Sequence, residues 1–245
     1  MKNPPLPKLL LAAALVASFP LLGAQAADES PAPSPPATTV PSDANFRAHV
    51  DYQTSWEDYL ATQKGKPCDI VFIGDSITQQ WRWGYGKPVW EKHFANRALD
   101  FGEGSDSTQH TLWRLKNLPV KEFKPKVAVI LIGTNNVNNS PEEIATGVEA
   151  VVKETKSVFP GAKIILMSIL PNARATQKMA DANVIIKTMA DEKEIFYLDL
   201  AAKMTPEGEN WKGLQRDRLH LTTAGYEMWA AELEPLLARL APKQG

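Results

Sequence analysis

One short stretch limits what this chain can fold into more than any other. A strand-like segment at residues 69–73, apolar from Ile70 on, leads directly into the sequence Gly74-Asp75-Ser76. A continuous apolar run of this length predicts a strand covered on both faces, as in a parallel sheet between helices. Because such sheets bind their ligands beyond the carboxyl ends of the strands, Ser76 stands where a nucleophile would be mounted. A turn that caps a helix is the simpler interpretation of this segment taken alone.

Strand-like and helix-like segments alternate along the rest of the chain. This alternation predicts one α/β domain, a flavodoxin-like three-layer αβα sandwich with a parallel sheet of about five strands. The expected strands are residues 69–73, 97–101, 127–132, 163–169 and 195–199, and the expected helices are residues 45–63, 108–116, 141–157, 173–190 and 222–240.

The first 26 residues have the pattern of a secretion signal. Lys2 and Lys8 precede an apolar run at residues 9–22, and Ala24 and Ala26 form the small-residue motif of a cleavage site. The run is shorter than the roughly 20 apolar residues that span a bilayer, although an uncleaved anchor is the alternative. We therefore expect cleavage after this motif and export to the periplasm or the outside of the cell, with no membrane span left in the mature chain.

The composition then changes twice. Residues 27–43 are rich in Pro, Ala, Ser and Thr, which predicts a disordered linker before a domain at residues 44–245. Cys68 is the single cysteine, so no disulfide can form within the chain. The 27 basic and 28 acidic residues are balanced and form no long run, which argues against nucleic acid as a partner. The oligomeric state stays open.

Polar segments gather where the expected sheet has its carboxyl edge. A glycine-rich and serine-rich segment at residues 102–108 follows the second strand, Gly133-Thr134-Asn135-Asn136 follows the third, and Asp217 and His220 precede the last helix. A hydroxyl, an imidazole and a carboxylate together can make a serine nucleophilic at neutral pH. Each segment alone also has a plain interpretation as a turn or a cap. The sequence shows no Cys/His cluster for a metal and no phosphate-binding motif, so we expect no cofactor.

The order of these segments resembles that of the SGNH (GDSL) hydrolase superfamily. Within it, the chain is most similar to the catalytic subunits of platelet-activating-factor acetylhydrolase and their bacterial relatives. The resemblance rests on residues 71–76, 101–115, 133–136 and 219–221, in a frame from about residue 45 to 240. It therefore covers the whole predicted domain.

The resemblance implies a role for each candidate residue. Ser76 would be the nucleophile, His220 the general base and later the acid, and Asp217 the group that orients the imidazole. The backbone N–H of Ser76 and the side-chain amide of Asn135 would donate to the oxyanion. The third donor in the family is a glycine N–H, and here the family pattern places Ser105 at that position.

At Ser105 the chain departs from the family pattern. The acetylhydrolases carry Gly-x-Gly-Gly-Asp, and this chain has Gly102-Glu103-Gly104-Ser105-Asp106. A serine still donates a backbone N–H, so the oxyanion hole can persist, but a left-handed backbone at this position would be strained. We expect the donor to be kept.

The resemblance implies a secreted serine esterase that hydrolyses short acyl esters, above all acetyl esters. An exported enzyme would meet acetylated carbohydrate more readily than cytosolic lipid, which favours a carbohydrate ester. A lipid acetylhydrolase or lysophospholipase, a thioesterase, and a non-catalytic envelope binding module with the same fold are the alternatives. The candidates for substrate contact are Asp75, Gly104, Trp83, Tyr85 and Trp211.

Overall fold

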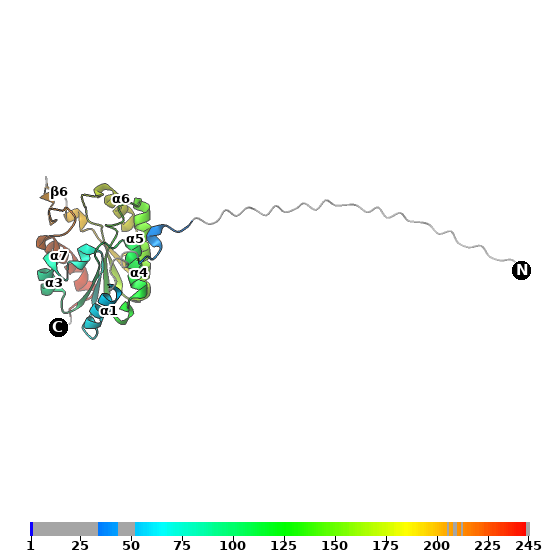
Figure 1. The fold of residues 1–245 in the computed structure, drawn as a ribbon, viewed down its shortest axis with the longest axis horizontal. Helices are drawn as coiled ribbons and strands as arrows, with labels where there is room; N and C mark the ends of the chain where they lie inside the picture. The colour runs from blue at the N-terminus through cyan, green and yellow to red at the C-terminus, as the bar shows by residue number, and fades with distance from the viewer. Residues whose placement is uncertain (2–33, 44–51, 205, 208–209, 212, 244–245) are drawn as a thin grey trace. The chain divides into compact units, whose positions relative to one another are not determined.

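The computed structural model has a central sheet flanked by helices (Figure 1). The sheet has five parallel strands in the order β2-β1-β3-β4-β5. The strands are β1 (Ile70–Gly74), β2 (Ala98–Gly102), β3 (Val127–Leu131), β4 (Lys163–Met167) and β5 (Ile195–Leu198). The chain passes from β1 outward to β2 and then returns to β3 on the other side of β1. In doubly wound sheets this change of direction opens a crevice at the carboxyl ends of the diverging strands. Ser76 follows β1 directly, so it lies at this crevice.

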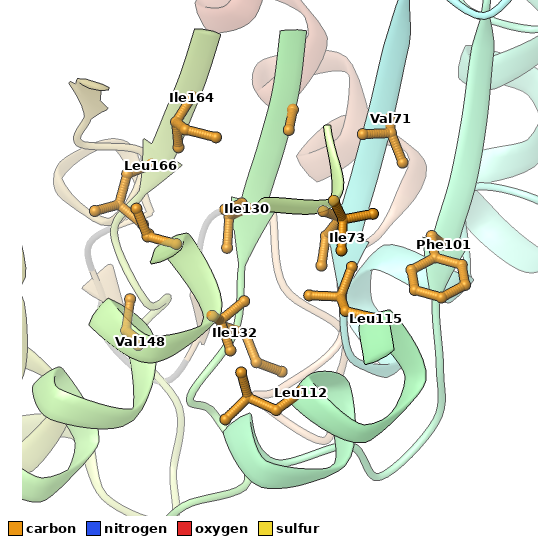
Figure 2. Close-up of a cluster of buried hydrophobic side chains, with 14 of the residues drawn as sticks. Val71, Ile73, Phe101, Leu112, Leu115, Ile130, Ile132, Val148, Ile164 and Leu166 are labelled. Carbon is orange, nitrogen blue, oxygen red and sulfur yellow. The ribbon is translucent and has the colours of Figure 1, made fainter. Parts of the chain in front are cut away.

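Helices cover both faces of the sheet, and the predicted three-layer αβα fold is confirmed. Val71 and Ile73 of β1 point to one core and Ile70 and Phe72 to the other, as alternate residues of a strand must. Figure 2 shows the first core, in which the β1 side chains meet Leu115 and its neighbours. The helices on that face are α1 (Tyr52–Gln63), α4 (Thr108–Asn117), α5 (Pro141–Val158) and α6 (Thr176–Lys187), and those on the other are α3 (Lys87–His93) and α7 (Thr223–Leu240).

The structure describes residue 1 and residues 34–43, 52–204, 206–207, 210–211 and 213–243. The predicted secretion signal at residues 1–26 lies almost wholly outside this part of the chain, so it stays a prediction. The same holds for the start of the helix predicted at residues 45–63, whose described part is α1. None of the described helices combines the length and the apolar character that crossing a bilayer requires.

The linker predicted at residues 27–43 is wrong at its carboxyl end. Residues Ala37–Thr39 form a short 3-10 helix, and Thr38 is only 1% exposed. The hydroxyl of Thr108 in α4 donates to the Thr38 carbonyl at 2.9 Å. A Cβ on Gly147 of α5 would overlap both threonine side chains, so this glycine makes room for the segment. The folded domain therefore begins before residue 44, because small residues can pack where a composition rule predicts a tether.

The helix predicted at residues 173–190 is shorter in the structure, where α6 runs from Thr176 to Lys187. The reason lies in the loop before it. The side-chain carbonyl of Asn172 accepts hydrogen bonds from the N–H groups of Arg174 and Ala175, at 3.1 and 3.2 Å. This Asx-type turn competes with helix formation and delays the first helical residue.

A buried ion pair ties the ends of β1 and β2 to the loop that follows β2. The side chains of Arg114 and Asp106 are both 0% exposed, and Nη2 of the arginine lies 2.7 Å from Oδ2 of the aspartate. The guanidinium also donates to the carbonyl of Phe101 at 3.0 Å and to that of Gly74 at 3.2 Å. One side chain thus joins two strand ends to the loop that contains Ser105.

We predict that Arg114→Met lowers the free energy of unfolding by about 3–5 kcal/mol, because it leaves the Asp106 carboxylate buried without its counter-charge. Urea unfolding followed by circular dichroism measures this change. The double variant Arg114→Met/Asp106→Asn, which has no buried charge at this site, should be more stable than Arg114→Met alone. An exposed control, Arg216→Met, should change stability by less than about 0.5 kcal/mol. If Arg114→Met lowered the free energy of unfolding no more than the control does, the stabilising role of the Arg114–Asp106 ion pair would be contradicted.

Candidate active site

Ser76 is the first residue of the short helix α2 (Ser76–Gln79), which follows β1 directly. Asp75 is the N-cap of this helix, and its Oδ1 accepts the N–H of Ile77 at 2.9 Å. Burial raises the pKa of the Asp75 carboxyl to about 6, although the hydrogen bond from Ile77 opposes the shift. Asp75 is 0% exposed. The prediction that Asp75 contacts substrate is therefore wrong, because its carboxyl is enclosed by the turn that it caps.

Two glycines let α2 lie directly across the ends of the strands. A Cβ on Gly74, the last residue of β1, would overlap the Thr78 hydroxyl and the Leu131 carbonyl. A Cβ on Gly102, the last residue of β2, would overlap the backbone nitrogen of Gln79. Without side chains at these two positions, the helix approaches closely enough to present Ser76 at the crevice.

Ser76, His220 and Asp217 form one hydrogen-bonded chain. Oγ of Ser76 lies 2.9 Å from Nε2 of His220, and Nδ1 of the same ring lies 2.7 Å from Oδ2 of Asp217. The carboxylate at Nδ1 favours the tautomer with its proton there, which leaves Nε2 to accept from the serine hydroxyl. Residues 144 positions apart in the sequence are thus in direct contact.

The aspartate is held in its charged form. Partial burial alone would raise the pKa of Asp217, but hydrogen bonds from the imidazole and from the N–H groups of His220 and Leu219 outweigh burial and lower the pKa below its ordinary value. Oδ1 accepts these two N–H groups at 3.1 and 3.0 Å. An ionised Asp217 can orient the imidazole and stabilise its protonated form.

The loop that carries His220 is closed by its own backbone. Leu214 and Leu221 form an antiparallel bridge, and the N–H of Gln215 donates to the His220 carbonyl at 2.8 Å. Arg218 adopts the left-handed conformation, with φ of 53°, which turns the chain between the aspartate and the histidine. The imidazole is therefore mounted on a tight loop.

Ser76 and Asn135, two of the three predicted oxyanion donors, each have an N–H that can donate to an oxyanion. As the first residue of α2, Ser76 has a backbone N–H that the helix itself leaves without an acceptor. Asn135 lies in the loop after β3, half-buried, and one N–H of its amide donates to the Asp106 carbonyl at 2.9 Å. An amide nitrogen carries two hydrogens, so a second N–H remains to donate to an oxyanion.

Ser105 adopts the strained conformation considered for it from the sequence. Its φ is 64°, in the left-handed region that favours glycine. The N–H of Asp106 donates to the Glu103 carbonyl at 3.3 Å, so Ser105 is the third residue of a tight turn where positive φ is required. Ser105 keeps its backbone N–H, and the residue is exposed.

The predicted substrate-contact residues differ in their surroundings. Trp83 and Tyr85 are 53% and 52% exposed, and Gly104 lies against the side chain of Gln79. Trp211 lies in β7 (Asn210–Trp211), which pairs with β6 (Pro206–Glu207), and its side chain lies outside the described part. A cavity of about 150 Å³ is lined by Trp83 with Trp56, Tyr59, Gln79, Arg82 and Glu103. Of the predicted aromatic walls, Trp83 therefore lies at this cavity.

Within the described residues, no group of three His, Cys, Asp or Glu side chains is arranged to hold a metal ion. The site is built from hydrogen-bonding and titratable side chains. Such an arrangement can deprotonate a hydroxyl and stabilise negative charge on a carbonyl oxygen.

Arg174 was not among the predicted site residues, but it is exposed and contacts Asn135. Its Nη2 lies 3.1 Å from Oδ1 of Asn135. The signal was available, since polar residues just after a parallel strand lie at the shared edge, and Asn172 and Arg174 follow β4. The same rule had identified the loops after the first three strands.

Comparison with known proteins agrees with the fold and the site. The profile of the GDSL-like Lipase/Acylhydrolase family matches residues 72–228, which include Ser76, Asn135 and His220. The chain belongs to this family. Its members include esterases and acylhydrolases, and the chain is accordingly a carboxylic ester hydrolase.

Individual relatives cover most of this GDSL-type hydrolase. Platelet-activating factor acetylhydrolase IB subunit alpha2 of Rattus norvegicus is 36% identical over 184 residues, which are 72% of this chain and 79% of that protein. Subunit alpha1 of Bos taurus is 30% identical over 221 residues, 87% of this chain and 91% of that protein. The crystal structure of a GDSL-like lipase from Bacteroides thetaiotaomicron has a TM-score of 0.62 at 22% identity, covering 76% of this chain and 98% of that one. The last likeness concerns the fold alone.

We predict that Ser105→Gly raises the free energy of unfolding by about 0.5–1 kcal/mol. Relief of the left-handed strain, about 1–2 kcal/mol, exceeds the added entropy of an unfolded glycine. Ser105→Ala is the matched control, because it keeps the Cβ and should bring no gain. Thermal unfolding of the three proteins measures the difference. Equal stability of the glycine and alanine variants would show that the conformation is not strained.

Proposed function

We propose that the chain hydrolyses short-chain acyl esters, acetyl esters above all, through Ser76, His220 and Asp217. The observation that carries the proposal is the continuous hydrogen-bonded chain from Oγ of Ser76 to the Asp217 carboxylate, in a carboxylic ester hydrolase. The names of the acetylhydrolase relatives support the acetyl group.

The reaction would proceed in two halves. Oγ of Ser76 attacks the ester carbonyl carbon while Nε2 of His220 takes the hydroxyl proton, and the carbonyl oxygen becomes an oxyanion. The bond to the alcohol then breaks, and His220 gives its proton to the departing oxygen. Water, deprotonated by His220, attacks the acyl-enzyme and releases the carboxylic acid and the free Ser76.

The oxyanion would be bound by the N–H groups of Ser76 and Ser105 and by the side-chain amide of Asn135. Each such donor is worth about a hundredfold or more in rate when its geometry is fixed. The ionised Asp217 holds the imidazole in the tautomer that accepts the proton.

We predict that Ser76→Ala and His220→Ala each lower kcat on p-nitrophenyl acetate by at least about a thousandfold, because each removes a group that takes part in bond formation or proton transfer. Steady-state kinetics on the folded variants measures this loss, and a p-nitrophenyl series from acetyl to dodecanoyl measures acyl-length preference. Turnover retained in both variants would reject the site and favour a non-catalytic binding module. A preference for long chains would favour lysophospholipase or thioesterase action.

The small cavity lined by Trp83 and Gln79 favours a neutral, hydroxyl-bearing alcohol. Gln79, which lines this cavity, lies three residues after Ser76 on α2, so the two side chains are about one helical turn apart. Glu103 accepts hydrogen bonds from the Gln79 amide and from the indole N–H of Trp56, both at 3.0 Å. The cavity lining combines carboxylate, amide and guanidinium groups with the exposed Trp83, and such a lining is suited to bind a sugar ring and its hydroxyls.

The same cavity is a poor match for a quaternary ammonium head group. The guanidinium of Arg82 lies over the rings of Tyr59 and Trp56, 4.4 and 5.0 Å from their centroids, and pairs with buried Asp100 at 3.2 Å. The rings of Tyr59 and Trp56 therefore already have a cation over them, which leaves Trp83 as the aromatic ring of this cavity without one among the described contacts. Together with the predicted export of the chain, this favours a carbohydrate ester. A lipid acetylhydrolase is the second candidate, because the relatives bear that name.

We predict that Trp83→Ala lowers the ratio of kcat/KM for an acetylated xylo-oligosaccharide to that for p-nitrophenyl acetate by about tenfold, the value of about 1.4 kcal/mol of ring stacking. Tyr85→Ala is the matched control, since Tyr85 is equally exposed and lies outside the residues that line the cavity. An unchanged ratio in Trp83→Ala would reject the sugar subsite. A wild-type preference for platelet-activating factor over the oligosaccharide would favour the lipid candidate.

A further inference from the structure

The side-chain amide of Asn135 is held at both of its ends. Its nitrogen donates to the Asp106 carbonyl at 2.9 Å, and its oxygen accepts from Nη2 of Arg174 at 3.1 Å. The same Nη2 donates to the Thr134 carbonyl at 3.1 Å, which fixes the guanidinium against the backbone before Asn135.

The two partners favour the same orientation of the amide. A carbonyl can only accept and a guanidinium can only donate. If the amide turned by 180°, its oxygen would face the Asp106 carbonyl and its nitrogen would face Arg174, so both contacts would become repulsive. The nitrogen and oxygen ends of an amide are nearly equal in size, and the surrounding hydrogen bonds therefore decide which end faces the crevice.

Arg174 is itself attached to the loop that carries the histidine. Its backbone N–H donates to the side chain of Asn172, which is 1% exposed, at 3.1 Å. The N–H of Ala173 donates to the carbonyl of Arg218 at 3.1 Å, between Asp217 and His220. The segment after β4 thus spans from the histidine loop to Asn135.

We propose that Arg174 is a positioning residue for ester hydrolysis, which keeps the N–H of Asn135 directed at the oxyanion. The inference rests on the proposed function, because it takes Asn135 as an oxyanion donor. The bond from the guanidinium is charge-assisted, so it also polarises the amide and strengthens the N–H as a donor. Since the oxyanion exists only after attack on the carbonyl, the effect falls on kcat and leaves KM nearly unchanged.

A double-variant cycle on p-nitrophenyl acetate tests the inference with Arg174→Ala, Asn135→Ala and the combination. We expect kcat to fall about tenfold in Arg174→Ala, with KM within about twofold, and about a hundredfold in Asn135→Ala. In the Asn135→Ala background, removal of Arg174 should cost less than about twofold, because the amide it positions is absent. Arg174→Lys, which keeps a cationic donor, should recover part of kcat.

The controls separate a positioning role from other roles. Arg216→Ala, at an exposed position of the histidine loop, should leave both constants unchanged. Losses that multiply in the double variant, or a change confined to KM, would overturn the inference and indicate direct contact with substrate. Unchanged turnover in Arg174→Ala, with turnover lost in Ser76→Ala, would overturn it and leave the proposed function standing. Turnover retained in both Ser76→Ala and Asn135→Ala would overturn both.

Discussion

The geometry of the active site depends on the buried ion pair between Arg114 and Asp106. The guanidinium satisfies the carbonyls at the ends of β1 and β2, and the carboxylate fixes the loop after β2. The backbone carbonyl of Asp106 in turn receives the amide of Asn135 from the loop after β3. One buried ion pair therefore holds the segments after β1, β2 and β3 in place, either directly or through the Asp106 carbonyl. Because neither charge is exposed, displacing either partner would leave the other buried without its counter-charge, and this couples the oxyanion loop to the core.

Close approach of backbone segments is the second condition for the site. Gly74 and Gly102 have no side chain where α2 crosses the strand ends, so Ser76 begins a helix directly above the sheet. His220 lies on a short loop closed by backbone hydrogen bonds. The segment that contains Arg174 is hydrogen-bonded both to that loop and to Asn135. Ser76, Ser105 and Asn135 come from the segments after β1, β2 and β3, and His220 comes from the segment after β5. The parallel topology brings them to one edge, since every segment that follows a strand begins there.

The sequence predicted much of this, and its errors have physical causes. Continuous apolar runs predicted the strands, because a strand in a sheet covered on both faces has few polar side chains. Asp75 was assigned to substrate because it adjoins Ser76, but a helix N-cap buries its carboxylate. The linker was drawn too long because composition cannot show that Thr38 fits beside Gly147. Arg174 was missed because the rule that polar residues after a parallel strand lie at the shared edge was applied to the first three strands and not to β4.

By itself the sequence determined the αβα layers, the family, and the candidate nucleophile, base and acid, because these follow from local patterns and from the order of short motifs. Only the tertiary structure decided the distances among them, the left-handed backbone of Ser105, the occupation of the Tyr59 and Trp56 rings by Arg82, and the contact between Arg174 and Asn135. These features depend on residues far apart in the chain, and their spacing in three dimensions is set by packing, which no local pattern encodes.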